Sequence, residues 1–142
     1  MVPSGSSSAD VEWAAKRARI LELTARYNHA FDGGDVDAYV ATFTPDGVME
    51  IDGGPRYEGS AALAEMCANT PAGTIMHVTV NPVVTVDGDR AHQEVTLLVV
   101  GMPRQPGEPS RLQRSGRYSD DLVRTEQGWR FTRRRVQLHG GM

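Results

Sequence analysis

The stretch "RYNHAFDGGDVDAYVATFTPDGVMEI", Arg26 to Ile51, is expected to take the chain from a first helix through a second helix into its first strand. From Asp10 to Ala30, apolar residues recur at steps of three and four, which predicts an amphipathic helix. "DGGD" ends that helix because glycine tolerates a left-handed backbone, and Asp35 is placed to cap a short second helix, "VDAYVATF". "TPDG" then predicts a turn before the strand "VMEID".

The rest of the chain is predicted to be mostly strands. A short strand, "RYEG", is followed by a helix from Ser60 to Ala68 with Ser60 as its expected cap. The long β segments are "TIMHVTVNPVVTVDG", "RAHQEVTLLVVGM" and "RSGRYSDDLVRTEQGWRFTRRRVQL"; the last holds two strands joined at "TEQG", and "PRQPGEPS" predicts a loop before it. Helices followed by antiparallel strands indicate an α+β domain whose curved sheet wraps around the helices, and not a doubly wound α/β fold.

Length and composition bound the class of protein. With 142 residues and 39% hydrophobic content, the chain is long enough for one domain with its own core. We expect that domain over residues 10–138, a disordered segment over residues 1–9 and a flexible C-terminus over residues 139–142. The net charge of -3 gives no overall attraction to nucleic acid, and no apolar run approaches the roughly 20 residues that span a bilayer. Because Cys67 is the one cysteine, no internal disulfide can form, and we expect a cytoplasmic protein without nucleic-acid or membrane partners.

Two phrases, "FTPDGV" and "YSDDLVRTEQGWRF", within this order of helices and strands, resemble the SnoaL-like branch of the nuclear transport factor 2 (NTF2-like) superfamily. The resemblance extends from Val11 to Val136. It implies a cone-shaped α+β barrel, in which a curved, mostly antiparallel sheet and N-terminal helices enclose a deep, largely apolar pocket for a small hydrophobic molecule. The sequence is most similar to the group that contains scytalone dehydratase, the bile acid 7α-dehydratase and the hexachlorocyclohexane dehydrochlorinase, which are elimination enzymes.

This resemblance implies a catalytic site of three side chains. In that group an aspartate just after the first long helix pairs with a histidine at the start of a central strand, and these positions fall on Asp32 and His77. The bile acid enzyme also has a tyrosine five residues before the aspartate, which falls on Tyr27. The second histidine of the scytalone enzyme would fall near "TLLVV", where this chain has none. No cofactor and no metal are implied, and relatives commonly form dimers or trimers through the outer sheet face, so we expect a homo-oligomer.

The chemistry of these residue types supports the pair. The pKa of an ordinary histidine, about 6.5, lies near neutral pH, and an aspartate bonded to one ring nitrogen leaves the other nitrogen as a base. Tyr27 could donate its phenolic proton to a developing oxyanion or a departing hydroxyl. Structural interpretations remain open: Asp32 as a helix-ending turn residue, His77 as a structural strand residue, and Tyr27 as a core aromatic. Alternation places His77 on one strand face with Ile75 and Thr79, without deciding whether that face looks inward.

The run "RRR" lies in the last predicted strand, where alternate side chains face opposite sides of the sheet. Several relatives carry a pocket arginine in this strand, which binds an anionic group or a leaving halide. By that resemblance Arg134 is the candidate substrate-binding residue, with Arg135 as the alternative. The structural interpretation is an ion pair with Glu94, Asp120 or Asp121 on a neighbouring strand.

Other side chains carry less weight as site residues. His29 and Asp32 are three residues apart and could share a helix face. With His77 or His92 they would make a two-histidine, one-carboxylate metal site, but the helix ends near Asp32 and no second ligand pair has recognisable spacing. Cys67 lies in the apolar segment "AALAEMCA" and is interpreted as a small buried hydrophobic residue, not as a nucleophile.

The leading functional hypothesis is a lyase or isomerase of the dehydratase kind. In it, Asp32 and His77 act as an acid/base pair, without a cofactor, on a small hydrophobic cyclic or ketonic substrate. The alternative is non-catalytic binding of a small molecule, or a polyketide-type cyclase or accessory protein on the same fold.

Overall fold

The structure, a computed structural model, describes residues 7–142, which fold into three helices and six strands. The helices are α1 (Ser8–Asp32), α2 (Val36–Val40) and α3 (Ser60–Ala68), and the strands are β1 (Phe43–Ile51), β2 (Arg56–Glu58), β3 (Ile75–Asp87), β4 (Arg90–Gly101), β5 (Arg111–Thr125) and β6 (Gly128–Leu138). Within this part of the chain, no helix is both long enough and apolar enough to cross a membrane.

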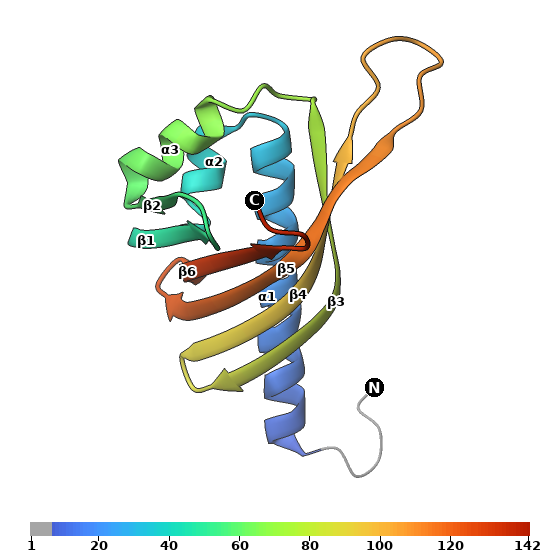
Figure 1. The fold of residues 1–142 in the computed structure, drawn as a ribbon. Helices are drawn as coiled ribbons and strands as arrows, with labels where there is room; N and C mark the ends of the chain where they lie inside the picture. Colours follow the sequence, from blue (N-terminus) through green and yellow to red (C-terminus); the bar gives the residue numbers. More distant parts are fainter. Residues whose placement is uncertain (1–6) are drawn as a thin grey trace.

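The strands form one curved sheet in the order β2, β1, β6, β5, β4, β3. Neighbouring strands are antiparallel, except that β1 and β6 run parallel. Figure 1 shows the sheet bending around α1, with α2 and α3 at the end of the molecule where β1 and β2 lie. The α+β prediction is confirmed. Because β2 and β3 are the two edges of the sheet and do not pair, the predicted barrel is an open, curved sheet.

Helix α1 begins at Ser8, two residues before the predicted start. The Ser7 hydroxyl accepts a hydrogen bond from the backbone N–H of Asp10, and the Asp10 carboxylate accepts one from the backbone N–H of Ser7, which together form a capping box. Ser8 and Ala9, which the sequence predicts to be disordered, are therefore helical. Of the rest of that predicted segment, Ser7 is the cap residue of α1, and residues 1–6 lie outside the described residues.

The sequence "DGGD" ends α1 as predicted. Gly34 has a φ of +71°, which glycine adopts without strain, and the Asp35 carboxylate accepts a hydrogen bond from the N–H of Ala38 in the first turn of α2. Helix α2 is shorter than predicted because the carbonyl of Thr42 accepts a hydrogen bond from the N–H of Phe131 in β6. With that bond the chain joins β6 directly after α2, so β1 begins at Phe43, before the start of the predicted strand.

Two short segments differ from their predicted form. The stretch "TPDG" is an irregular part of β1, where the register with β6 shifts after Phe43. A Cβ at Gly47 would lie 2.8 Å from the Cβ of Phe43, so this irregular path favours glycine. Helix α3 has its predicted bounds, but Gly59 is its cap residue, and the Ser60 hydroxyl donates to the carbonyl of Pro45 instead.

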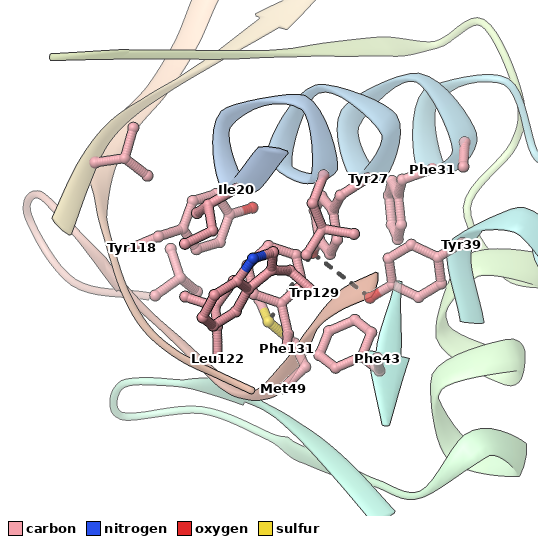
Figure 2. Close-up of a cluster of buried hydrophobic side chains, with 14 of the residues drawn as sticks. Ile20, Tyr27, Phe31, Tyr39, Phe43, Met49, Tyr118, Leu122, Trp129 and Phe131 are labelled. Carbon is pink, nitrogen blue, oxygen red and sulfur yellow. Dashed lines mark hydrogen bonds between the residues drawn. The ribbon is translucent and has the colours of Figure 1, made fainter. Parts of the chain in front are cut away.

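The core lies between α1, α2 and the concave face of the sheet (Figure 2). Its centre is an aromatic cluster in which ring centroids lie 5.0 to 6.5 Å apart, formed by Tyr27, Phe31, Tyr39, Phe43 and Phe131. Buried aromatic side chains each remove roughly 150–250 Å² from water. The cluster therefore joins both helices to the sheet through a large apolar contact.

Strand β3 changes which of its side chains face inward at a bulge. Its register with β4 shifts between Val80 and Val83, and Asn81 has a φ of 56°. Before the bulge His77 faces α1, and after it Val84 faces the core with 6% of its surface exposed. In a regular strand these two positions would face opposite sides, because they are an odd number of residues apart. Because of the bulge, the first part of β3 turns His77 toward α1 and the second part turns Val84 toward the core.

The bulge predicts a different response to two substitutions at Asn81. We expect Asn81→Gly to change the free energy of unfolding by less than about 0.5 kcal/mol, because glycine adopts the same backbone angle. Asn81→Val should lower it by about 1–2 kcal/mol, because a β-branched side chain is strained at positive φ. Urea denaturation measures both. Equal losses in the two variants would mean that the Asn81 side chain, and not its backbone angle, supports the bulge.

Candidate active site

A cavity of about 650 Å³ lies between α1 and the strands β3 and β4. This volume is within the range of small-molecule sites, roughly 300–1,000 Å³. Most of its exposed wall is apolar. The lining residues are Leu21, Thr24, Ala25, Asn28, His29, Asp32, Gly33, Gly73, Ile75, Met76, His77, Thr79, Pro82, Gln93, Val95 and Met102.

Asp32 and His77 form a hydrogen-bonded pair at this cavity. Asp32 Oδ1 lies 2.6 Å from Nδ1 of His77, and Asp32 Oδ2 accepts the backbone N–H of the same residue at 2.8 Å. Their side chains are 18% and 10% exposed, respectively. The ring of Phe31 meets the imidazole edge to face, with centroids 5.2 Å apart, and helps to fix its plane. Because Nδ1 donates to the carboxylate, Nε2 carries the lone pair of the neutral ring.

The carboxylate of Asp32 is not used in the turn that ends α1. Its hydrogen bonds go to β3, 45 positions along the chain. The turn itself is closed by backbone groups: Gly33 donates to the carbonyl of His29, and Gly34 donates to the carbonyl of Phe31. The structure also shows which face of β3 looks inward: His77 contacts Asp32 and Phe31 of α1, whereas the neighbouring Met76 is exposed. Asp32 and His77, which the resemblance paired, are therefore in direct contact in the structure.

A polar stripe of α1 faces β3 and β4. Thr24, Asn28 and Asp32 are four residues apart and therefore lie on one face of the helix. Thr24 Oγ1 accepts a hydrogen bond from Gln93 Nε2 on β4 at 3.0 Å. Asn28 Nδ2 donates to Thr79 Oγ1 on β3, also at 3.0 Å. With the aspartate–histidine pair, three successive turns of α1 are each bonded to a strand.

Asn28, Thr79 and Gln93 are cavity residues that the predicted site did not include. The available signal was the spacing of four between Asn28 and the neighbouring polar residues of "TARYNHAFD", which puts them on one face of a predicted helix. Thr79 and Gln93 carried no such signal, because a polar strand residue takes its role from the element packed against it.

Tyr27 does not line the cavity, so its predicted role as a proton donor to substrate is corrected. It precedes Asn28 and points to another side of α1, where only 1% of its surface is exposed. Its hydroxyl accepts a weak hydrogen bond from the Tyr39 hydroxyl at 3.5 Å and lies 4.0 Å from Met49 Sδ (Figure 2). Tyr27 is a core aromatic, which was its structural interpretation.

Arg134 lies in the core and not in the cavity, so its predicted role in substrate binding is corrected as well. Its Nε and one terminal nitrogen donate to the two carboxylate oxygens of Asp120 at 2.9 and 3.2 Å, and its guanidinium lies 3.6 Å from the ring centroid of Tyr118. The alternative, Arg135, points outward and binds Asp52 at 2.7 Å. The physical reason is sheet order: β5 separates β6 from the strands that line the cavity.

The Asp120 carboxylate is ionised by its contacts. It accepts two N–H groups of Arg134 and one from Gln93 at 2.9 Å, and all three partners are donors. Burial raises the pKa of Asp120, and the charge of Arg134 opposes that rise. Burial lowers the pKa of Arg134, but the charge and hydrogen bonds of Asp120, together with Tyr118 and Tyr27, outweigh it, and the pKa of Arg134 is raised. The hydrogen-bond geometry supports an ionised carboxylate at Asp120 and an ionised guanidinium at Arg134.

His92 faces away from the cavity, since it precedes Gln93 on β4 and points to the opposite face of the sheet. Its ring nitrogens bind Asp121 at 2.9 Å and Glu94 at 2.8 Å. Burial alone lowers the pKa of His92, but these two hydrogen bonds and their negative charges outweigh it, and the pKa is raised. In the described part of the chain, no group of three His, Cys, Asp or Glu side chains is placed to hold a metal ion.

Cys67 is fully buried in α3, as predicted for a small hydrophobic residue. Burial raises the pKa of its thiol, and the charge of Asp35 adds to that rise. Both effects disfavour the thiolate that a nucleophile requires.

The SnoaL-like domain family matches residues 12–135 of the chain. The chain belongs to this family. The match covers all the residues that line the cavity, and it confirms the resemblance found between Val11 and Val136. No curated protein matches the sequence.

Solved structures with this fold support the same assignment. An NTF2-like protein with a cystatin-like fold from Novosphingobium aromaticivorans is 25% identical, with a TM-score of 0.84 over 98% of this chain and 94% of that chain. A variant of Rv3472, a protein of unknown function from Mycobacterium tuberculosis, is 27% identical, with a TM-score of 0.81 over 95% of this chain and 78% of that chain. A candidate scytalone dehydratase from Novosphingobium aromaticivorans is 19% identical, with a TM-score of 0.76 over 92% of this chain and 87% of that chain. At that identity the likeness shows the fold alone.

The buried ion pair predicts an asymmetric cost of substitution. Arg134→Met should lower the free energy of unfolding by about 3–5 kcal/mol, because it leaves the Asp120 carboxylate buried without its counter-charge. The double variant Asp120→Leu with Arg134→Met should lose clearly less, because no isolated charge remains. Urea denaturation compares the two. A double variant less stable than the single one would contradict this account of the core.

The raised pKa of His92 predicts a pH-dependent stabilisation on the outer sheet face. Its contribution is fully present below the unfolded pKa of about 6.5 and is lost as the pH rises through the higher folded pKa. We therefore expect His92→Gln to lower the melting temperature more at about pH 5.5 than at about pH 8.5. The effect should be small, because the His92 side chain is 43% exposed and solvent screens it. An equal loss at both pH values would contradict the prediction.

Proposed function

We propose that this protein is a small-molecule lyase or isomerase that uses Asp32 and His77 as an acid/base pair. The observation that carries the proposal is that the Asp32 carboxylate makes two hydrogen bonds to His77, one with the ring nitrogen Nδ1 and one with the backbone N–H. The bond to Nδ1 favours the tautomer that carries its proton there, which leaves Nε2 as the basic atom at a largely apolar cavity. Membership of the SnoaL-like family is compatible with it.

The reaction begins with transfer of a proton from the carbon next to a substrate carbonyl to Nε2 of His77. The electron pair of the broken C–H bond moves onto the carbonyl oxygen and gives an enolate, while Asp32 stabilises the imidazolium. If the next carbon bears a hydroxyl, the electrons return, the C–O bond breaks, and the imidazolium proton leaves with the hydroxide as water. If a carbon–carbon double bond adjoins the deprotonated carbon instead, the negative charge extends over it, the proton returns at the far carbon of that bond, and the product is an isomer with a shifted double bond.

In this proposal Thr79 is the hydrogen-bond donor to the substrate, the role that the sequence analysis gave to Tyr27. Its Oγ1 accepts the hydrogen bond from Asn28, which leaves the hydroxyl proton of Thr79 available to a ligand. Thr79 lines the cavity on the same strand face as His77. A donor at this place would hydrogen-bond the carbonyl oxygen and stabilise the enolate.

A second candidate function is binding of a small molecule without catalysis. It is favoured by the hydrogen bond from the backbone N–H of His77 to Asp32, since a carboxylate used to join two elements would be needed in a binding protein as well. The two functions differ in one property, which is whether a bound ketone exchanges the hydrogens next to its carbonyl with solvent.

The test is hydrogen–deuterium exchange of α-tetralone, a two-ring ketone, in D₂O with the purified protein, followed by NMR. We expect catalysed exchange, and a loss of about 10²- to 10⁴-fold in rate for His77→Gln, which removes the base. Asp32→Asn should also reduce the rate, because the amide can no longer stabilise the imidazolium. His92→Gln, on the opposite sheet face, is the matched control and should exchange at the wild-type rate.

Tight binding of the ketone without exchange in the wild-type protein would reject the acid/base function and favour the binding protein. Exchange that survives His77→Gln would place the base elsewhere, with His29 as the next residue to substitute, because it also lines the cavity.

A further inference from the structure

The end of the β4–β5 hairpin carries a positive charge that the rest of the chain does not share. Residues 101–117 contain four arginines and one glutamate, a net charge of +3, while the net charge of the whole chain is -3. All other residues together therefore carry a net charge of -6. The glutamate, Glu108, accepts a hydrogen bond from a backbone N–H at 3.1 Å. In the described part of the chain, no ion pair involves any of the four arginines, which are Arg104, Arg111, Arg114 and Arg117.

Arginines elsewhere on the sheet are neutralised by carboxylates of a neighbouring strand. Arg133, for example, binds Glu50 at 2.8 Å. In the hairpin, Arg114 donates to the carbonyl of Gly141, which is an uncharged acceptor. The positive charge of the hairpin therefore remains uncompensated, and it determines the electrostatic field that an approaching molecule meets.

The hairpin projects from the body of the protein, as the orange segment of Figure 1 shows. The pairing of β5 with β6 stops at Gly116, so residues 111–114 pair with β4 alone. Every residue from 103 to 114 is exposed. A ribbon of two strands gains little stability in water unless something packs against it. Its surface is therefore open to another molecule.

Strand pairing places two of the arginines on the cavity side of this ribbon. Arg114 and His77 belong to one row of paired residues across β5, β4 and β3. Arg111 and Ile75 belong to another such row, nearer the tip of the hairpin. Because paired residues share a face of the sheet and His77 faces α1, both arginines lie on the face that borders the cavity.

Apolar side chains lie on the same side as these arginines. Ile75 and Met102 are half-buried and line the cavity. An acidic protein segment offers both carboxylates for the arginines and apolar side chains for these two residues. A nucleic-acid backbone offers phosphates alone, and the negative charge of the remaining residues repels a long polyanion or an anionic membrane.

From these observations we propose that the β4–β5 hairpin is a docking surface for an acidic protein segment that carries apolar side chains. Arg111 and Arg114 bind its carboxylates, and Arg104 adds to the attraction from the tip of the hairpin. Ile75 and Met102 contact its apolar side chains at the edge of the cavity. Bound there, the partner lies next to the candidate active site. The proposal does not depend on the chemistry in that cavity.

The test is the fluorescence anisotropy of a labelled helical peptide of glutamate, alanine and leucine, titrated with the protein. We expect saturable binding that weakens at least about fivefold between about 20 and 200 mM salt, because salt screens exposed charges. A peptide with serine in place of leucine should bind at least about threefold more weakly, because it loses the apolar contact with Ile75 and Met102.

Two double variants, compared at about 100 mM salt, locate the binding surface. Arg111→Glu with Arg114→Glu should weaken binding of the leucine peptide about tenfold or more, because two attractions become repulsions. The matched control, Arg19→Glu with Arg26→Glu, makes the same change in net charge on α1, beside the β5–β6 turn. It should change the affinity by less than about twofold, because it leaves the docking surface intact.

The mutated hairpin side chains are exposed, so we expect these variants to fold, and a thermal melt checks this. Arg111→Gln with Arg114→Gln provides a second pair of substitutions if charge reversal disturbs the fold. It should weaken binding about threefold, because it removes the attractions without adding repulsions.

A loss confined to the hairpin variants supports the docking surface. Equal losses in the hairpin and control variants, equal binding of the leucine and serine peptides, or no binding at low salt overturns it. Tighter binding of an oligothymidine or of phosphatidylglycerol vesicles overturns it in favour of a nucleic acid or a membrane. Self-association that Arg111→Glu with Arg114→Glu abolishes in sedimentation overturns it in favour of a second copy of the chain. Failure of α-tetralone to exchange rejects the acid/base function alone.

Discussion

A guanidinium in the middle of an aromatic core needs a counter-charge, and the carboxylate of Asp120 supplies it. Arg134 is fully buried, with its guanidinium 3.6 Å from the ring centroid of Tyr118 and 4.3 Å from that of Tyr27. The carboxylate in turn holds Gln93, and Gln93 holds Thr24 of α1. One hydrogen-bonded chain therefore runs from β6 through β5 and β4 to the helix. Removing a member leaves a buried charge or a buried amide without its partner, so the position of α1 on the sheet depends on the whole chain.

This network also connects the core to the candidate site. Its last strand member, Gln93, lines the cavity, and its helix member, Thr24, begins the polar stripe that ends at Asp32. The proposed acid/base pair is thus held on a helix whose orientation is fixed by hydrogen bonds to the inner face of the sheet. A site built on a helix and a strand in this way keeps its geometry better than one built on loops.

Helix α1 divides the interior into two regions of different character. Tyr27 and Phe31 face α2 and the sheet, where large rings fill the space. Asn28 and Asp32 face the first part of β3, where smaller and polar side chains leave the cavity. Adjacent residues such as Tyr27 and Asn28 therefore have different roles, since successive side chains on a helix point about 100° apart. The bulge at Asn81 produces the corresponding change on β3.

The sequence by itself determined the α+β class, the end of α1 at "DGGD", the bounds of α3 and the pairing of Asp32 with His77. The first three features rest on local chemistry, namely helical periodicity, glycine and cap residues. The pairing rests on family resemblance, because relatives already show which distant residues meet in the folded chain. Only the tertiary structure decided that Tyr27 and Arg134 belong to the core, that Asn28 and Gln93 line the cavity, and that α2 stops where β6 binds Thr42. Which face of an element meets a cavity depends on what packs against it from distant parts of the chain, and periodicity within one segment carries no information about that partner.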